Sequence, residues 1–321
     1  MTGVAFRLRA AAARAAGLAL VMLGVSVLTF ALQLLAPGDP AEVLLRARSD
    51  NPAPERVAAL RRELGLDQAW PRQYAAWLGR ALRLDLGRSL RSGEPVAVEI
   101  AARLPATLEL AGCAFVLVVL LSGLAGFSTA LRPSAAGDRL PRWISLLLVS
   151  LPSYWLGLLL IYGLALGLGW LPAAGRDGWT SLVLPALTLA LGVAAMQGRI
   201  LRAGVLEALG QDCVRFAYAK GLGRRRVLTA HVLRGVWGPL LSLWGMTLGH
   251  LLGGAVVVET VFAWPGLGRL LVEAVLGRDL PLVQGLVLLM TVALVLASAA
   301  ADLMAARLDP RHREPAGLGP A

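Results

Sequence analysis

Residues that could bind a metal ion or act as nucleophiles are few in this chain, which has three histidines and two cysteines. It contains no CxxC pair, no HExxH motif and no GxSxG motif, the arrangements that hold zinc or expose a catalytic serine. The sequence therefore predicts neither a metal site nor a hydrolase, and we assign no catalytic residue. The residues concerned are Cys113, Cys213, His231, His250 and His312.

The chain also lacks a phosphate-binding loop. The Walker A pattern GxxxxGK[ST] places backbone N–H groups and a lysine on the phosphates of a nucleotide. Lys220 is the only lysine of the chain, and no Ser or Thr follows it in the sequence Ala219-Lys220-Gly221. We therefore expect any energy source to be a membrane gradient or a partner protein, and we expect no cofactor in this chain.

The composition indicates a membrane protein. Hydrophobic residues make up 57% of the chain and charged residues 16%, whereas about 25% of a typical soluble domain is charged. A spanning helix needs about 20 apolar residues, and none of the apolar runs alternates as a barrel strand would. The sequence predicts an all-α integral membrane protein with six spans. The runs without Asp, Glu, Lys or Arg are 15–36, 110–131, 143–169, 180–198, 235–258 and 280–301.

Charge predicts the orientation of these spans. The tails and the connections on one side carry 17 Lys and Arg residues, and the short connections 170–179 and 259–279 on the other side carry three. Since basic loops stay in the cytoplasm, both termini are expected there. The sequence thus divides into residues 1–36 (tail and first span), 37–109 (extracytoplasmic segment), 110–301 (spans two to six) and 302–321 (cytoplasmic tail).

Two segments outside the spans are long enough to form structure of their own. In 37–109, Val57, Leu60 and Leu64 recur at helical spacing, a second helix is expected around 74–84, and 85–89 is predicted to be a turn. This segment is expected to form a helical cap over the outer mouth; the alternative is a loosely ordered loop. The basic segment 199–234 is expected to lie in the cytoplasm and to contain a helix at 211–220, followed by a turn at Gly221 and Gly223. Such a segment suits either docking to a partner or anchoring to anionic lipid.

Four stretches of the sequence are distinctive. They are 35–41 (LAPGDPA); 63–67 (ELGLD) with 73–74, 77–78 and 85–87; 215–222 (RFAYAKGL) with 231–234 (HVLR); and 254–259 (GAVVVE) with 262–268 (FAWPGLG) and 278–279. Together they resemble the permease subunits of bacterial ABC importers of the peptide and nickel branch, and the resemblance extends over about residues 15–311. The third stretch resembles the cytoplasmic EAA loop of these permeases.

This loop departs from the general EAA pattern at five positions. Arg215 stands where the pattern has Glu, and His231 and Arg234 stand where it has Ile and Pro, as is usual in the peptide branch. Cys213 and Tyr218 replace the more common Tyr and Arg. These differences affect the details of a contact with a partner, and the expected docking role is kept.

The resemblance implies a mechanism and a set of partners. The chain would pair with a second, similar permease in the bacterial inner membrane, two ATP-binding subunits would hold the ATP and Mg²⁺, and an extracytoplasmic protein would deliver the solute. The cytoplasmic loop would insert a coupling helix into an ATP-binding subunit. The residues assigned to this coupling are Cys213, Val214, Arg215, Ala217, Ala219, Lys220, Gly221, Leu222, Arg224, Arg225 and Arg226.

The solute and its path are less constrained by the sequence. Met246 and His250 share a face of the fifth span at i, i+4, and Glu259 closes that span. Each is a candidate for the translocation path. For His250, however, a hydrogen bond between helices is the role more to be expected, and for Glu259 a structural hydrogen-bonding role. The stretches 46–55, 104–112, 170–173 and 178–179 look closer to nickel permeases than to dipeptide permeases. The expected solute is nickel or a nickel chelate, with small peptides as the alternative.

Two other classes of function are left open by the residues alone. A gradient-driven carrier or channel usually keeps ionisable groups at mid-membrane, and the six runs hold only His250 of that kind. A membrane scaffold or receptor would transport nothing. Uptake into vesicles with and without ATP and partner chains separates these classes.

Overall fold

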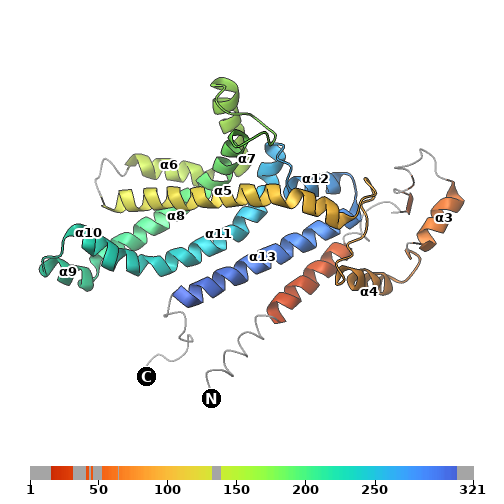
Figure 1. Cartoon of the computed structure of the whole chain (residues 1–321), viewed down its shortest axis with the longest axis horizontal. Coiled ribbons are helices and arrows are strands. Elements are labelled where there is room, and N and C mark those ends of the chain that lie inside the picture. The colour runs from red at the N-terminus through yellow and green to blue at the C-terminus, as the bar shows by residue number, and fades with distance from the viewer. Residues whose placement is uncertain are drawn as a thin grey trace, which may run out of the picture. The chain divides into compact units, whose positions relative to one another are not determined.

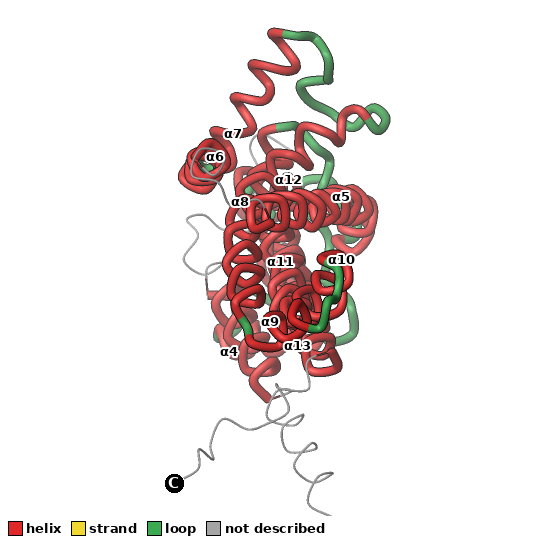
Figure 2. Tube along the Cα trace, turned by 90° about the vertical axis from the view of Figure 1, so that its left-hand side faces the viewer, coloured by secondary structure: helices red, strands yellow, loops and turns green. Residues whose placement is uncertain are grey.

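The computed structural model describes residues 16–31, 41, 42, 45, 53–63, 65–131 and 139–308, with only the backbone described for 301–308. The regular structure in these ranges is helical (Figure 2). This confirms the predicted all-α class. One isolated antiparallel bridge joins Arg88 and Pro95. The elements labelled in Figure 1 and their neighbours are α3 Pro54–Glu63, α4 Trp70–Ala81, α5 Val96–Leu131, α6 Arg139–Ser150, α7 Ser153–Leu160, η1 Ile161–Gly167, α8 Thr180–Gly210, α9 Asp212–Ala219, α10 Arg224–Val227, η2 Leu228–Val232, α11 Leu233–Val261, α12 Leu267–Leu276 and α13 Leu280–Leu308.

Within the described residues, three helices are long and apolar enough to cross a membrane: Val96–Leu131, Thr180–Gly210 and Leu280–Ala300. Two bent pairs raise this number to five if each pair counts as one span. The predicted first span, 15–36, is described only as the shorter apolar helix Ala16–Ala31. Six spans therefore stay a prediction.

The predicted third span, 143–169, is broken. Its two halves, Leu140–Ser150 and Ser153–Gly167, meet at an angle of 112°. The break lies at Leu151 and Pro152, where Pro152 has a ψ of 141° and precedes the first turn of α7. Proline has no N–H to continue the hydrogen-bond ladder, and it restricts the residue before it to extended conformations. The run was predicted to be one span because its hydrophobicity is unaffected by the break, although Pro152 itself is a local signal for it.

The chain divides into two compact units. The first contains residues 1–105 and 270–295, and the second contains residues 106–269 and 296–321. In the first unit, the rings of Phe30, Tyr74 and Trp77 lie with centroids 5.4–6.0 Å apart. The Tyr74 hydroxyl forms a 2.7 Å hydrogen bond with Ser26 Oγ.

Helices α3 and α4 begin close to where the sequence predicts helices. Helix α5 begins at Val96, upstream of the boundary predicted at residue 109.

The second unit is built around α8 and α11, which lie side by side with α5 and α7 packed against them (Figure 1). Close packing of α5 on α8 depends on Gly126, since a Cβ there would lie 2.7 Å from Leu201 Cγ. Two buried apolar clusters fill the unit. One includes Leu110, Leu184 and Trp264, and the other lies where α9, α10 and η2 meet α8 and α11.

Candidate functional site

Helix α9 and the residues after it form a short hairpin on the end of α8. Val214 and Ala217, three residues apart, are 2% and 4% exposed and pack into the second apolar cluster with Val205 and Val227. The other faces of α9 are open, and Phe216 is 67% exposed. One side of α9 therefore fixes it to the bundle, and the opposite side is free to meet another molecule.

The turn after α9 is a Schellman motif. Gly221 has a φ of +76°, its N–H donates to the Tyr218 carbonyl at 2.9 Å, and the Leu222 N–H donates to the Ala217 carbonyl at 3.2 Å. These bonds satisfy carbonyls that a helix end leaves free. Glycine is favoured at such a φ because it has no Cβ. Gly223, by contrast, has a φ of −66°, so the sharp turn depends on Gly221 alone and not on both glycines as expected.

The charged residues of this hairpin differ in what they contact. The Arg224 guanidinium donates to the Leu131 carbonyl at 2.8 Å and so caps the end of α5. Arg215 lies 3.8 Å from Asp212, but both side chains are more than three-quarters exposed, where an ion pair contributes at most about 1 kcal/mol. Arg225 and Arg226 are exposed. Of these arginines, Arg224 thus has a clear role within the chain itself.

The other assigned residues of the coupling segment lie along the same hairpin. Ala219 ends α9, and Leu222 packs partly buried against the second apolar cluster. Cys213 and Lys220 are exposed. The structure thus brings all the assigned coupling residues into one contiguous hairpin, with Val214 and Ala217 turned inward.

Glu259, near the end of α11, is fully buried and accepts three hydrogen bonds. Thr107 Oγ1 donates to it at 2.6 Å, and the backbone N–H groups of Gly268 and Arg269 donate at 2.7 and 3.1 Å. Thr107 in turn accepts the Leu267 N–H at 2.8 Å. Because these N–H groups belong to the first turn of α12, which has no helical acceptors for them, Glu259 and Thr107 together cap α12.

Two glycines make this arrangement possible. A Cβ on Gly266 would lie 2.2–2.4 Å from the Glu259 carboxylate, and one on Gly268 would lie 2.4 Å from Val256 Cα. Trp264 precedes these glycines in the sequence and follows α11. It is fully buried, and its indole N–H donates to the Ala106 carbonyl at 2.9 Å. The FAWPGLG stretch is thus a packed turn that joins α11, α12 and α5.

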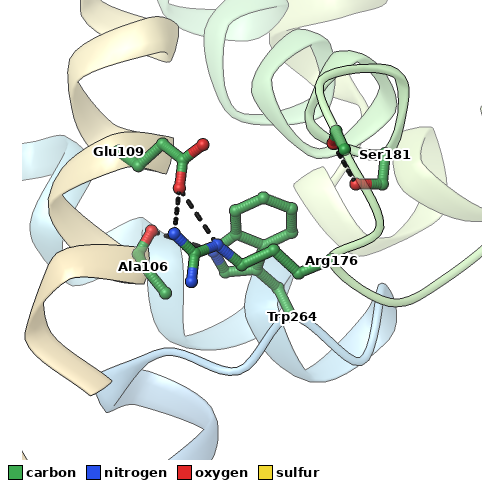
Figure 3. A network of polar contacts seen from close by, with 6 residues as sticks. Ala106, Glu109, Arg176, Ser181 and Trp264 are labelled. Atoms are coloured by element: carbon green, nitrogen blue, oxygen red, sulfur yellow. Dashed lines mark hydrogen bonds and ion pairs between the residues drawn. The ribbon is translucent and has the colours of Figure 1, made fainter. Parts of the chain in front are cut away.

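Figure 3 shows a second charged contact beside this turn. The Arg176 guanidinium donates to Glu109 Oε2 at 2.6 and 3.0 Å, and its Cζ lies 5.7 Å from the centroid of the Trp264 ring. Both charged side chains are about 40% exposed. Arg176 therefore fixes the 170–179 connection to α5 and to the turn after α11, with its charge shared between a carboxylate and an aromatic face.

Met246 and His250 lie on the open face of α11. Met246 is 61% exposed, His250 is also exposed, and the His250 ring nitrogen Nδ1 lies 3.2 Å from the Met246 carbonyl of the same helix. The exposed residues continue at Gly253 and Val257. Glu259 is not part of this face. The structure therefore separates the three residues assigned to the translocation path, and their role there stays a prediction.

Sequence reasoning did not identify Thr107 and Arg176, because their partners Glu259 and Glu109 are distant in the sequence. Phe216 and Tyr218, two exposed aromatic residues of α9, were not among the coupling residues named one by one from the sequence.

The comparisons with known proteins agree with this arrangement. Residues 122–314 match the family described as binding-protein-dependent transport system inner membrane component, and residues 7–111 match the N-terminal domain that accompanies it. Among solved structures, the MetNI methionine ABC transporter in an inward-facing conformation has a TM-score of 0.57 at 17% identity, over 66% of this chain and 96% of that chain. This likeness shows a shared fold.

Relatives of closer sequence are themselves transport permeases. The glutathione transport system permease protein GsiC of Escherichia coli O6:H1 (strain CFT073) is 39% identical over 94% of this chain and 97% of its own length. A protein of Brucella abortus (strain 2308), provisionally named a peptide transport system permease, is 40% identical over 91% of this chain and 95% of its own length. The fold and these similarities define a membrane permease subunit of an ABC importer, and not an enzyme. The chain belongs to the family of binding-protein-dependent transport system inner membrane components, in its peptide and nickel branch.

Proposed function

We propose that this subunit moves small peptides, of the size of a dipeptide or glutathione, into the cell. The observation that supports this proposal is the 39–40% identity, over more than nine-tenths of the chain, to permeases named for glutathione and for peptides. The nickel cargo suggested by the sequence has no such support. In the part of the chain that the structure describes, no three His, Cys, Asp or Glu residues come together where they could hold a metal ion.

The proposed mechanism uses the α9 hairpin as the coupling element. Phe216 and Tyr218 would enter a groove of an ATP-binding subunit, and Val214 and Ala217 would transmit its movement to α8 and α11 through the second apolar cluster. ATP binding shifts the transporter between its inward-open and outward-open packings if it favours one of them. Because the α9 hairpin is fixed to the bundle on one side and exposed on the other, it would pass a movement of the ATP-binding subunit on to the bundle.

The proposed assembly contains a second permease, two ATP-binding subunits and an extracytoplasmic solute-binding protein. Both termini of this chain would lie in the cytoplasm, as the distribution of basic residues favours. The exposed face of α11 with Met246 and His250 would then meet the sister permease along the translocation path.

Uptake in a strain that lacks the transporter genes tests the cargo. Cells that regain the complete transporter are expected to accumulate radiolabelled dialanine or glutathione, and a strain whose ATP-binding subunits cannot hydrolyse ATP is the control. Accumulation of radioactive nickel with no uptake of either peptide would overturn the proposal.

A further inference from the structure

A polar cavity of about 500 Å³ lies within the first unit. It is enclosed by the turn 89–92, the first turns of α5 and α13, and the second half of α12. Its volume is in the range of small-molecule binding sites. Five of its lining residues are charged: Arg91 and Arg103 are basic, and Glu99, Glu273 and Asp279 are acidic. None of these residues belongs to the coupling hairpin or to the Glu259 network.

A buried carboxylate holds the walls of the polar cavity. Asp279 is 1% exposed and accepts hydrogen bonds from Ser89 Oγ at 2.5 Å and from the N–H groups of Leu90, Arg91 and Leu282 at 3.1–3.3 Å. These bonds tie the 89–92 turn to the start of α13. Because hydrogen-bond donors of the protein already surround the Asp279 carboxylate, its negative charge is compensated within the cavity wall. The charged groups that would face a ligand are therefore those of the other four charged lining residues, which we call the rim of the cavity: Arg91, Arg103, Glu99 and Glu273.

The two arginines of the rim are not neutralised by neighbouring carboxylates. In the portion of the chain that the structure describes, neither the Arg91 nor the Arg103 guanidinium forms an ion pair. The side chain of Arg91 passes over Gly277, where a Cβ would lie 3.9 Å from Arg91 Cδ. Arg103 follows Glu99 by one helical turn on α5, and it is half-buried. These guanidinium groups suit the carboxylate of a ligand.

The two glutamates of the rim have the opposite charge and come from different helices. Glu99 lies in the first turn of α5 and contacts Ser92 Oγ, and Glu273 lies on α12. Both are half-buried. A cavity with cations and carboxylates on its rim favours a ligand that carries one charge of each sign, because each of the ligand's charges can replace its lost hydration with a partner.

We infer that the polar cavity binds a short zwitterionic peptide, with the peptide carboxylate at Arg91 and Arg103 and its ammonium group at Glu99 and Glu273. This inference rests on the proposed peptide cargo and adds to it a receiving site on this subunit. Such a site would hold the peptide by its termini, so that side chains of different kinds could be accepted. The same residues would reject a peptide whose termini are blocked.

Equilibrium binding to the complete transporter tests this site without the solute-binding protein. The purified complex in nanodiscs is titrated with dialanine, dialanine amide, N-acetyl-dialanine and the doubly blocked peptide. Blocking either terminus is expected to weaken binding by about tenfold or more, since a hydrogen bond to a charged group contributes about 1.5–3 kcal/mol. Equal affinity for dialanine and the doubly blocked peptide, or no binding of dialanine, would overturn the inference.

Charge-removing variants locate the two ends of the peptide. Arg103→Gln is expected to weaken dialanine binding and to leave dialanine amide unaffected, whereas Glu273→Gln is expected to weaken dialanine and to leave N-acetyl-dialanine unaffected. Arg56→Gln, an exposed arginine of α3 outside the cavity lining, controls for net charge. Equal weakening of all four peptides by a folded variant would contradict the assignment. Arg91→Gln, at an exposed position, repeats the test if Arg103→Gln does not fold.

The failure of this inference is distinct from failure of the proposed cargo. Peptide uptake by cells together with no terminus-dependent binding would remove the receiving site and keep the peptide cargo. Nickel uptake without peptide uptake would remove the cargo, and with it the reason for a peptide at this cavity.

Discussion

Gly266 and Glu259 depend on each other at the scale of single residues. The carboxylate caps α12 only because the glycine leaves it the space that a side chain would fill. Gly266 lies in the turn between α11 and α12, and Glu259 lies in α11 and contacts Thr107 of α5, so a change at either position affects the packing of all three helices.

Replacing Gly266 with Ala is expected to destabilise the protein by about 1–3 kcal/mol, the usual cost of overpacking a filled interior. The physical reason is that the new Cβ would lie 2.2–2.4 Å from the Glu259 carboxylate. Thermal unfolding of the purified complex measures the loss. Gly253→Ala on α11 is the matched control, because nothing lies within 4 Å of a Cβ at that position. Equal melting temperatures for the two variants would show that the turn is not tightly packed.

At the scale of elements, the α9 hairpin combines a fixed face with an exposed one. The fixed face follows from two small or branched apolar residues at i, i+3, and the turn that ends the helix follows from one glycine with a positive φ. Stability and coupling are therefore expected to respond to different substitutions in the same short helix.

Gly221→Val is expected to weaken assembly with the ATP-binding subunits and to lower solute-stimulated ATP hydrolysis. No heavy atom lies within 4 Å of a Cβ at this position, so the expected cost arises from the backbone: a side chain at φ +76° costs about 1–2 kcal/mol. Gly223→Val serves as the comparison, since its φ is −66° and its surroundings are also open. If both variants assemble and couple like the natural protein, the coupling element lies elsewhere.

Phe216→Ala is expected to reduce ATP hydrolysis coupled to transport while the melting temperature stays within error, because Phe216 is 67% exposed. Val214→Ala is expected to lower the melting temperature, at a cost of about 0.5–2 kcal/mol of stability, since Val214 is 2% exposed. Co-purification and thermal unfolding of the two variants separate these effects. Loss of stability on Phe216→Ala would place that side chain inside the bundle.

At the scale of the whole molecule, orientation in the membrane decides whether the hairpin can meet an ATP-binding subunit. The chain carries its own probe, because Cys213 on α9 is exposed and Cys113 is partly buried among the apolar residues of α5. Labelling of one native thiol therefore reports on which side of the membrane α9 lies.

In a Cys113→Ser background, a membrane-impermeant maleimide is expected to label Cys213 in inside-out vesicles and not in intact cells. The reason is the positive-inside distribution of arginines around α9. Permeabilised cells provide the control for thiol reactivity. Labelling of Cys213 in intact cells would reverse the proposed topology and exclude coupling to cytoplasmic ATP-binding subunits through α9.

The sequence determined the features that depend on local composition. The apolar runs predicted the all-helical membrane class, Gly221 predicted the turn after α9, and the motif resemblance predicted the family. Such features can be read locally because hydrophobic burial and glycine's backbone freedom act on neighbouring residues.

The tertiary structure decided what depends on residues distant along the chain. It gave Glu259 its partners from α5 and α12, and it paired Arg176 with Glu109. It also formed the polar cavity from residues of four separate segments. Hydrogen-bond partners and cavities arise only when elements pack, so they cannot be read from neighbouring residues.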